Sequence, residues 1–383
     1  MVVSGRAVRV LYVTDGWTVH DRRFALGLVE SGHEVVYRAV GRTGSSIEDG
    51  PASLAPAFSV DEWRAGAVSF WFRLPGMVRE VRRLVREFRP DVIHAGPIQR
   101  GAFIAALAGG RPLVSMSWGS DLLWDARRGL GKRIAEVVLR RTDSLVCDCE
   151  TVRRRSLELG MDPRRVVVFP WGVDLEAFAV NGRPRLREAL GWQKAFVLVS
   201  ARTWEPVYGV DLVVDAFTIA LSRQPALRLL LLGNGSHRRR ILRRLNATEA
   251  IRRVHMAGPV RHNDLPDYFR SADLYVSASR SDGSSVTLLE AMASGLPAVV
   301  SDIPSNLEWV ESGVHGWTFR DGDPHSLAEA ILDAFDKRAR LKAMGRAVRE
   351  LAEARADWTK NFRRLYEAYA LAESCADRRP HAA

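Results

Sequence analysis

The sequence contains little cysteine, with three residues in 383 at Cys147, Cys149 and Cys375. An odd number without a repeating spacing excludes a disulfide scaffold and indicates a reducing compartment. No second ligand pair accompanies Cys147 and Cys149, so we interpret them as residues at the end of a strand and not as metal ligands.

Long apolar runs are also missing. No stretch of about 18 apolar residues predicts a membrane span, and the first residues lack the apolar segment of a signal peptide. We therefore expect a cytoplasmic protein, and contact with the inner face of a membrane stays open.

Lysine is scarce, and arginine supplies most of a net charge of +11. This charge favours anionic partners such as phosphorylated ligands or an anionic membrane surface, although basic faces that are merely solvated explain it equally well. No nucleic-acid-binding module accompanies the charge, so nucleic acid is not an expected partner. With 47% hydrophobic and 26% charged residues the chain is globular, and its length predicts two domains.

Short apolar strands alternate with amphipathic helices in both halves of the chain. A strand over 7–15, a helix over 22–32 and a strand over 33–40 form a β-α-β unit, which implies a parallel sheet. The alternation pauses at a polar connection over 173–194 and restarts with a strand over 195–202.

The repeated alternation predicts an α/β fold with two doubly wound Rossmann-like domains, 1–175 and 176–357, facing across a cleft. Ligands of such sheets bind outside the carboxyl ends of the strands. A last helix over about 358–375 suits packing back on the first domain, and packing within the second domain is the competing interpretation.

The stretch SDGSSVTLLEAMASG, residues 281–295, follows a predicted strand and opens a helix. Gly283, Ser284 and Ser285 lie where the helix begins, so free amides and the positive end of the helix dipole favour an anion such as a diphosphate. Asp282 and Glu290 can face the same ligand and accept hydrogen bonds from sugar hydroxyls. A capped core helix with two solvent-exposed acids is the alternative.

This stretch resembles the signature of glycosyltransferase family 4, retaining enzymes with the GT-B fold, in which an acid is followed by seven residues and a glutamate. The pair falls on Asp282 and Glu290. The segments GHEVVY, RPDVIHAG, VVVFPWGVDLEAF and ESGVHGWTFRDGDPHSLAEAI resemble other family segments in the same order, so the resemblance covers nearly the whole chain.

The resemblance implies roles for the residues that match. Glu290 would hold the ribose of the donor, Asp282 would lie beside the donor sugar, and Arg202 would contact the diphosphate and stabilise its charge as it departs. The distal phosphate and the sugar hydroxyls would meet the backbone of Gly283, Ser284, Ser285, Val286 and Thr287. Catalytic roles are expected for Asp282, Arg202 and His20.

Two positions of the donor side depart from the family. Asp282 is shorter than the usual glutamate. Tyr208 precedes Gly209 where a lysine is usual, and Arg261 or His262 are candidates to replace its charge.

The first domain matches the family in part. Gly16 and His20 match its first loop, although a capping or core role suits His20 almost as well. Asp121 matches a further position, but Trp118 stands where a histidine is usual and could instead stack on a sugar. Gly16, Trp118 and Asp121 are therefore the expected residues on the acceptor or sugar side.

The resemblance implies a retaining glycosyltransferase that moves a sugar from a nucleoside diphosphate-sugar to an acceptor hydroxyl by front-face attack. No metal and no cofactor are expected. The alternatives are a nucleotide-sugar epimerase or phosphorylase, and a non-catalytic nucleotide-sugar-binding module. The base, the sugar and the acceptor are not encoded in any motif that we can interpret.

Trp63, Phe70, Trp71 and Phe72 precede an arginine-rich helix predicted over 77–90. They suit either a membrane-surface patch for a lipid-linked acceptor or an aromatic core loop beside a solvated basic helix.

Overall fold

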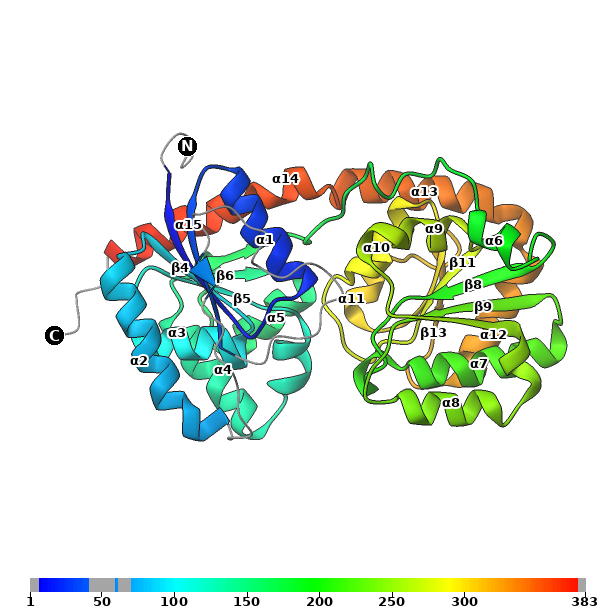
Figure 1. Ribbon diagram of the computed structural model, residues 1–383, viewed down its shortest axis with the longest axis horizontal. Helices are drawn as coiled ribbons and strands as arrows, with labels where there is room; N and C mark the ends of the chain where they lie inside the picture. The colour runs from blue at the N-terminus through cyan, green and yellow to red at the C-terminus, as the bar shows by residue number, and fades with distance from the viewer. Residues whose placement is uncertain (1–6, 41–58, 61–69, 378–383) are drawn as a thin grey trace. The chain divides into compact units, whose positions relative to one another are not determined.

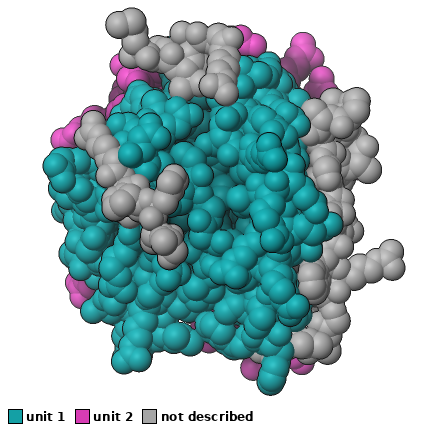
Figure 2. Space-filling view, turned by 90° about the vertical axis from the view of Figure 1, so that its left-hand side faces the viewer, with its two compact units in different colours: residues 1–169, 360–383 teal, residues 170–359 magenta. Residues whose placement is uncertain are grey.

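The computed structural model describes residues 7–40, 59–60 and 70–377 (Figure 1). The chain forms two compact units, coloured separately in Figure 2. Unit 1 comprises Met1–Phe169 with Lys360–Ala383, and unit 2 comprises Pro170–Thr359. Each unit has one parallel sheet flanked by helices, so the predicted fold class of two doubly wound α/β domains is confirmed.

The sheet of unit 1 has the order β3-β2-β1-β4-β5-β6-β7, and all its neighbouring strands are parallel. The chain winds outward in one direction from β1 and in the other from β4, so the order reverses between these two strands. The strands are β1 (Arg9–Thr14), β2 (Glu34–Ala39), β3 (Ser59–Val60), β4 (Val92–Ala95), β5 (Leu113–Met116), β6 (Ser144–Cys147) and β7 (Val166–Val168).

The helices of unit 1 bury apolar faces against this sheet. Helix α1 begins with a capping box in which the Thr18 side chain accepts from the Asp21 backbone and the Asp21 side chain accepts in return. The helices are α1 (Val19–Glu30), α2 (Phe70–Phe88), α3 (Phe103–Ala108), α4 (Gly129–Arg141), α5 (Glu150–Glu158) and α15 (Arg364–Asp377), with the short α14 (Trp358–Phe362) at the unit boundary.

The sheet of unit 2 repeats the same winding, with the order β10-β9-β8-β11-β12-β13 and parallel neighbours throughout. Here the order reverses between β8 and β11. The strands are β8 (Phe196–Ser200), β9 (Leu227–Leu232), β10 (Val254–Gly258), β11 (Leu274–Ser277), β12 (Ala298–Ser301) and β13 (Gly316–Phe319).

Two apolar clusters form the core of unit 2. One gathers α7 and α12 against the sheet, and the other gathers α10 and α13. The helices are α6 (Arg185–Ala189), α7 (Val210–Arg223), α8 (Arg238–Asn246), α9 (Leu265–Arg270), α10 (Val286–Ala293), α11 (Pro304–Leu307), α12 (Pro324–Asp336) and α13 (Leu341–Arg355).

Helix α2 begins earlier than the sequence predicts. Pro75 and Gly76 are helix breakers, which set the expected start at Met77, yet the helix runs from Phe70 through Pro75. Phe70 and Leu74 pack against the core, and this packing outweighs the local preference. Phe70, Trp71 and Phe72 are therefore helical, while Trp63 lies outside the described residues.

Helix α15 packs against β4, β5, β6 and β7 of unit 1. The buried Tyr369 hydroxyl lies 2.9 Å from His94 Nδ1 on β4. Burial lowers the pKa of His94 to about 3, so this histidine is neutral in the folded protein. The contact connects the last helix to the centre of the sheet.

Candidate functional site

The candidate donor site lies at the carboxyl ends of β8 and β11, the neighbouring strands at which the sheet order of unit 2 reverses. Arg202 follows β8, and Asp282 lies in the loop between β11 and α10. In open parallel sheets this reversal leaves a crevice in which ligands bind. The fold therefore brings together two residues that are 80 positions apart in the chain.

Arg202 is the centre of the site and is only 9% exposed. Its Nη2 donates to Asp282 Oδ2 at 2.5 Å, and its Nη1 donates to Ser285 Oγ at 2.6 Å and to Thr287 Oγ1 at 3.2 Å. Its guanidinium carbon lies 4.1 Å from the centre of the Tyr208 ring. The buried Nε has no hydrogen-bond partner within the protein, so one donor of the guanidinium is unsatisfied.

Opposing effects act on the pKa of the Asp282 carboxylate. Burial raises its pKa above the ordinary value, while Arg202 and hydrogen bonds from the Gly283 backbone, Ser285 and Ser279 oppose that shift. The ion pair with Arg202 thus stabilises the ionised form of Asp282, which burial alone would disfavour. Removing either partner would leave the other charge buried and uncompensated.

The start of α10 differs in detail from the prediction. Ser285 is its N-cap residue, but its side chain makes no capping hydrogen bond and instead accepts from Arg202. Ser284 accepts from Trp309 Nε1 at 3.0 Å. Because no side chain caps α10, its first backbone amides stay available to an anion.

Glu290 is 2% exposed on the second turn of α10. One of its carboxylate oxygens lies 2.7 Å from His262 Nε2. The sequence offered His262 only as a candidate to replace the missing lysine charge, and the structure places it on Glu290. Arg261, the other candidate, is exposed.

Tyr208 ends a short helical turn, Pro206–Tyr208, and Gly209 follows with a φ of 58°. A Cβ at Gly209 would lie 2.2 Å from the Ala278 carbonyl oxygen, so only glycine fits this close approach between the loops after β8 and β11. The turn holds the Tyr208 ring on Arg202. At the position where the family usually has a lysine, this chain therefore supports its arginine with an aromatic face.

The expected residues of unit 1 lie at the carboxyl edge of their own sheet. His20 is in α1, which follows β1, and Trp118 follows β5; their ring centres are 5.3 Å apart at an interplanar angle of 33°. The Gly16 carbonyl accepts from the Tyr37 hydroxyl at 2.5 Å. The structure thus brings the side chains of His20 and Trp118 together.

Asp121 is 4% exposed and its carboxylate is used inside unit 1. It accepts from the Ile98 amide at 2.9 Å, the Ser117 hydroxyl at 2.6 Å and the Leu122 amide at 3.0 Å. Burial raises the pKa of Asp121 and these hydrogen bonds oppose the shift. Asp121 therefore fixes the loops that follow β4 and β5.

Sequence reasoning missed two contacts of the donor site, Trp309 with Ser284 and Tyr275 with Thr287, the latter with 2.8 Å between the hydroxyl oxygens. A tryptophan in an ordinary loop and a tyrosine within an apolar strand carry no local signal for such contacts. Within the described ranges, no group of three or more His, Cys, Asp or Glu side chains could hold a metal ion.

Two family descriptions match the chain. "Glycosyltransferase Family 4" matches residues 14–177, and "Glycosyl transferases group 1" matches residues 182–351. A D-inositol 3-phosphate glycosyltransferase of Geodermatophilus obscurus is 32% identical over 222 residues, which are 55% of this chain and 49% of that protein. The chain spans about half the length of the first curated relatives it matches.

Solved structures share the fold. HepE of Anabaena in complex with UDP and glucose has a TM-score of 0.79 at 18% identity, covering 95% of this chain and 99% of that one. Sucrose-phosphate synthase of Thermosynechococcus elongatus has a TM-score of 0.81 at 17% identity, covering 95% and 98%. The two family matches occupy both units in order, and the chain therefore belongs to the family 4-like glycosyltransferases of the GT-B fold, as the sequence resemblance predicted.

Proposed function

We propose that this protein is a retaining glycosyltransferase that moves a sugar from a nucleoside diphosphate-sugar to an acceptor hydroxyl. One observation carries the proposal: the buried Arg202 meets Asp282, Ser285 and Thr287 at the reversal point of the unit 2 sheet, beside the uncapped start of α10. A guanidinium and free helix amides suit a diphosphate. The solved structure that contains UDP and glucose supports a nucleotide-sugar as the donor.

The leaving group gains negative charge as the bond from the sugar to the diphosphate breaks. Arg202 and the first amides of α10 stabilise this charge in the transition state, which lowers the barrier. In the front-face mechanism the acceptor oxygen bonds to the anomeric carbon on the face from which the diphosphate departs, so the configuration there is retained. A phosphate oxygen of the departing group accepts the proton of the acceptor hydroxyl. We propose that these groups meet the demand for positive charge without a metal ion.

Glu290 is proposed to accept hydrogen bonds from the ribose hydroxyls. Oε1 of Glu290 lies 2.7 Å from Nε2 of His262, which belongs to the turn after β10. This contact supports a role of the buried carboxylate as a hydrogen-bond acceptor. Asp282 is proposed to lie beside the donor sugar, and the backbone from Gly283 to Thr287 to meet the distal phosphate.

His20 and Trp118 are proposed to face the acceptor or the sugar. Their tilted contact presents an imidazole beside an indole surface, a combination that suits hydroxyl binding and sugar stacking. Gly16 and Asp121 would act by shaping the loops, since the Gly16 carbonyl and the Asp121 carboxylate already have partners.

The test is release of nucleoside diphosphate from UDP-, GDP- and ADP-sugars with a panel of hydroxyl acceptors, with and without EDTA. Release from one donor class, unchanged by EDTA, with an α-linked product from an α-donor by NMR, is expected. An inverted product would refute retention, and inhibition by EDTA that added metal reverses would refute metal independence. Nucleotide binding without turnover on any acceptor would favour the non-catalytic module.

A further inference from the structure

Large exposed apolar side chains of unit 1 gather in two short segments. Among the residues that the structure describes, the exposed large hydrophobic residues of this unit come from the start of α2 and from the segment 124–130, which ends at the start of α4. Trp71 is 47% and Phe72 is 83% exposed, and Trp124 is 38% and Leu130 is 57% exposed. Aromatic side chains at the surface cost free energy in water, so their concentration here indicates a binding surface.

The two segments are connected through Arg100. The Arg100 guanidinium carbon lies 4.5 Å from the centre of the Phe70 ring, beside Trp71. The helical turn Ile98–Ala102, which carries Arg100, contacts the turn Asp121–Asp125, which carries Trp124. Helix α3 contacts both α2 and α4, and the three helices lie beside one another in Figure 1. Trp71, Phe72, Trp124 and Leu130 therefore border one region, which we name the aromatic edge.

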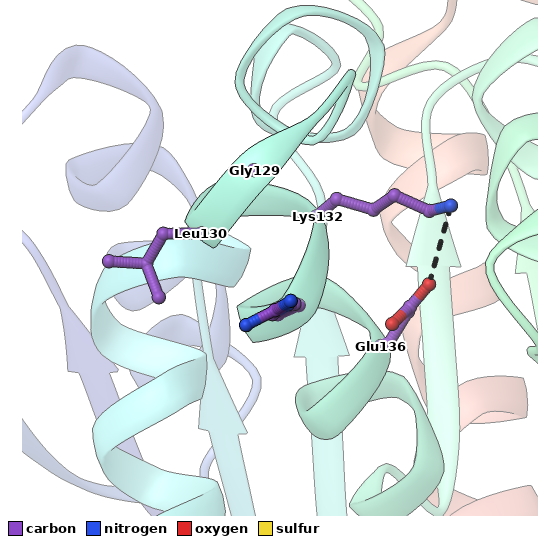
Figure 3. Close-up of a pocket in the computed structure, with 5 residues that line it drawn as sticks. Gly129, Leu130, Lys132 and Glu136 are labelled. Carbon is purple, nitrogen blue, oxygen red and sulfur yellow. Dashed lines mark ion pairs between the residues drawn. The ribbon is translucent and has the colours of Figure 1, made fainter.

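The charge of the aromatic edge is positive. Arg127 stacks over Trp124 at 4.1 Å, while Arg128 and Arg133 are exposed and form no ion pair with the described residues. The start of α4 also lines a surface hollow of about 470 Å³ with Leu130, Lys132 and Arg133. In Figure 3, Leu130 points away from Lys132, whose Nζ lies 3.7 Å from Glu136 Oε1.

Helix α2 also presents exposed aromatic rings beside an arginine. Trp71, Phe72, Pro75 and Arg79 fall within about 100° of arc around the helix at its 100° per residue, and Trp71, Phe72, Pro75 and Arg79 are exposed. A helix that presents tryptophan and phenylalanine beside arginine fits the boundary between headgroups and acyl chains, where the rings enter the apolar layer and the cations meet phosphates. A soluble protein partner would match the rings but gives no reason for the surrounding cations.

We propose that the aromatic edge of unit 1 docks on an anionic lipid bilayer. The chemistry it recognises is a layer of phosphate headgroups above an acyl region. The segments of the aromatic edge and the pair His20–Trp118 all lie at the carboxyl edge of the same sheet, since Trp71 and Phe72 are in the first turn of α2, which follows β3, and the other segments follow β1, β4 or β5. If the proposed function holds, a lipid-linked acceptor would therefore enter from this surface.

The experiment is flotation of the full chain with vesicles of phosphatidylglycerol and phosphatidylcholine in equal parts, and with pure phosphatidylcholine. Binding to the anionic vesicles at low salt is expected. The charge variant Arg128→Glu with Arg133→Glu should weaken it at least about tenfold, because each surface cation contributes on the order of a factor of five. Its matched control is Arg239→Glu with Arg243→Glu on α8 of unit 2, where both residues are exposed.

The apolar variant Phe72→Ser with Leu130→Ser should weaken binding roughly tenfold. Its control is Leu307→Ser with Val314→Ser, which changes exposed residues of unit 2 that are 51% and 42% accessible. Equal losses in a variant and its control, binding that ignores lipid charge, or no binding at all would overturn the proposal. Self-association lost in the apolar variant, without flotation, would assign the surface to a protein contact.

Nucleotide binding by the same variants separates this proposal from the proposed function. The proposed donor site belongs to unit 2, so the two variants of the aromatic edge in unit 1 should bind nucleotide as the unchanged protein does. A protein that floats with vesicles but binds no nucleotide would refute the function and leave the docking surface standing.

Discussion

The two units share a strand order but differ at the carboxyl edges of their sheets. In unit 2 this edge carries a buried polar network, with Arg202 on Asp282 and His262 on Glu290. In unit 1 it carries the His20–Trp118 ring contact and exposed aromatic rings. The fixed, paired side chains of unit 2 suit a charged ligand, whereas the rings of unit 1 suit an apolar or sugar surface. The class of donor is therefore proposed from the paired side chains of unit 2.

The largest expected effect comes from breaking the polar network at its centre. Arg202→Ala should lower turnover by at least about tenfold, since a charged hydrogen bond is worth ~1.5–3 kcal/mol. It should also cost roughly 3–5 kcal/mol of stability, because Asp282 stays buried without its partner. Initial rates and urea unfolding measure both effects.

A double variant sharpens this prediction. Arg202→Met with Asp282→Leu removes both charges, so it should recover much of the lost stability and stay inactive. If the double variant were as unstable as Arg202→Ala, the buried charge would not be the cause. Turnover like that of the unchanged protein in Arg202→Ala would contradict the site itself.

A second prediction concerns the core of unit 1, where His94 and Tyr369 form a buried polar pair. The pKa of His94 is about 3 in the folded protein, below the usual 6.5, so its contribution is complete above pH 6.5 and declines as the pH falls toward 3. Between pH 6.5 and 4 the loss is about 3 kcal/mol, at 1.36 kcal/mol per pH unit. His94→Gln should flatten this part of the stability curve measured by urea unfolding.

Tyr369→Phe is the control for His94→Gln. It removes the hydroxyl at Nδ1 but leaves the titrating imidazole buried, so it should lower stability at every pH and preserve the slope. Equal slopes in His94→Gln and the unchanged protein would assign the acid sensitivity to other groups.

A third prediction tests the coupling of Glu290 with His262. Glu290→Ala should weaken nucleotide binding by roughly 10- to 100-fold through lost ribose hydrogen bonds. His262→Ala should weaken it a few-fold by leaving Glu290 less well positioned, and should add nothing in the Glu290→Ala background. Additive losses in the double variant would show that His262 acts independently of Glu290.

The smallest effect compares one tryptophan at each edge. Trp309→Phe removes the hydrogen bond to Ser284, which is worth about 1 kcal/mol, and should weaken nucleotide binding a few-fold. Trp118→Phe should leave nucleotide affinity unchanged, because its role is proposed on the acceptor side. Calorimetry measures the nucleotide affinity of both variants. An equal loss of affinity in Trp118→Phe would contradict the proposal that unit 2 binds the donor and that Trp118 acts on the acceptor side.

The sequence predicts the fold well where periodicity is strong. The alternation of strands and helices predicted both sheets because buried parallel strands appear as unbroken apolar runs. The prediction failed where a helix-breaking residue lies inside a helix, as Pro75 does in α2. It also failed where an element is short, as with α6, which lies in the segment expected to be a polar connection. Packing decides these positions, and local preference does not carry that information.

Within the site, the spacing of Asp282 and Glu290 identified the acids but not their partners. Arg202 meets Asp282 across 80 positions, and His262 meets Glu290 across 28. Such contacts depend on the strand order, which periodicity leaves open. The resemblance to the family pointed to Arg202, because family motifs mark residues that the shared fold brings together. It did not point to Trp309, whose contact with Ser284 was found only in the structure.

The most direct test is calorimetric titration of the full chain with UDP, GDP and ADP, with and without EDTA, beside Glu290→Ala. The account predicts tight binding of one nucleotide, unchanged by EDTA and lost in Glu290→Ala. Absence of binding by all three, or equal binding by Glu290→Ala, would contradict the claim that the edge between β8 and β11 is the donor site.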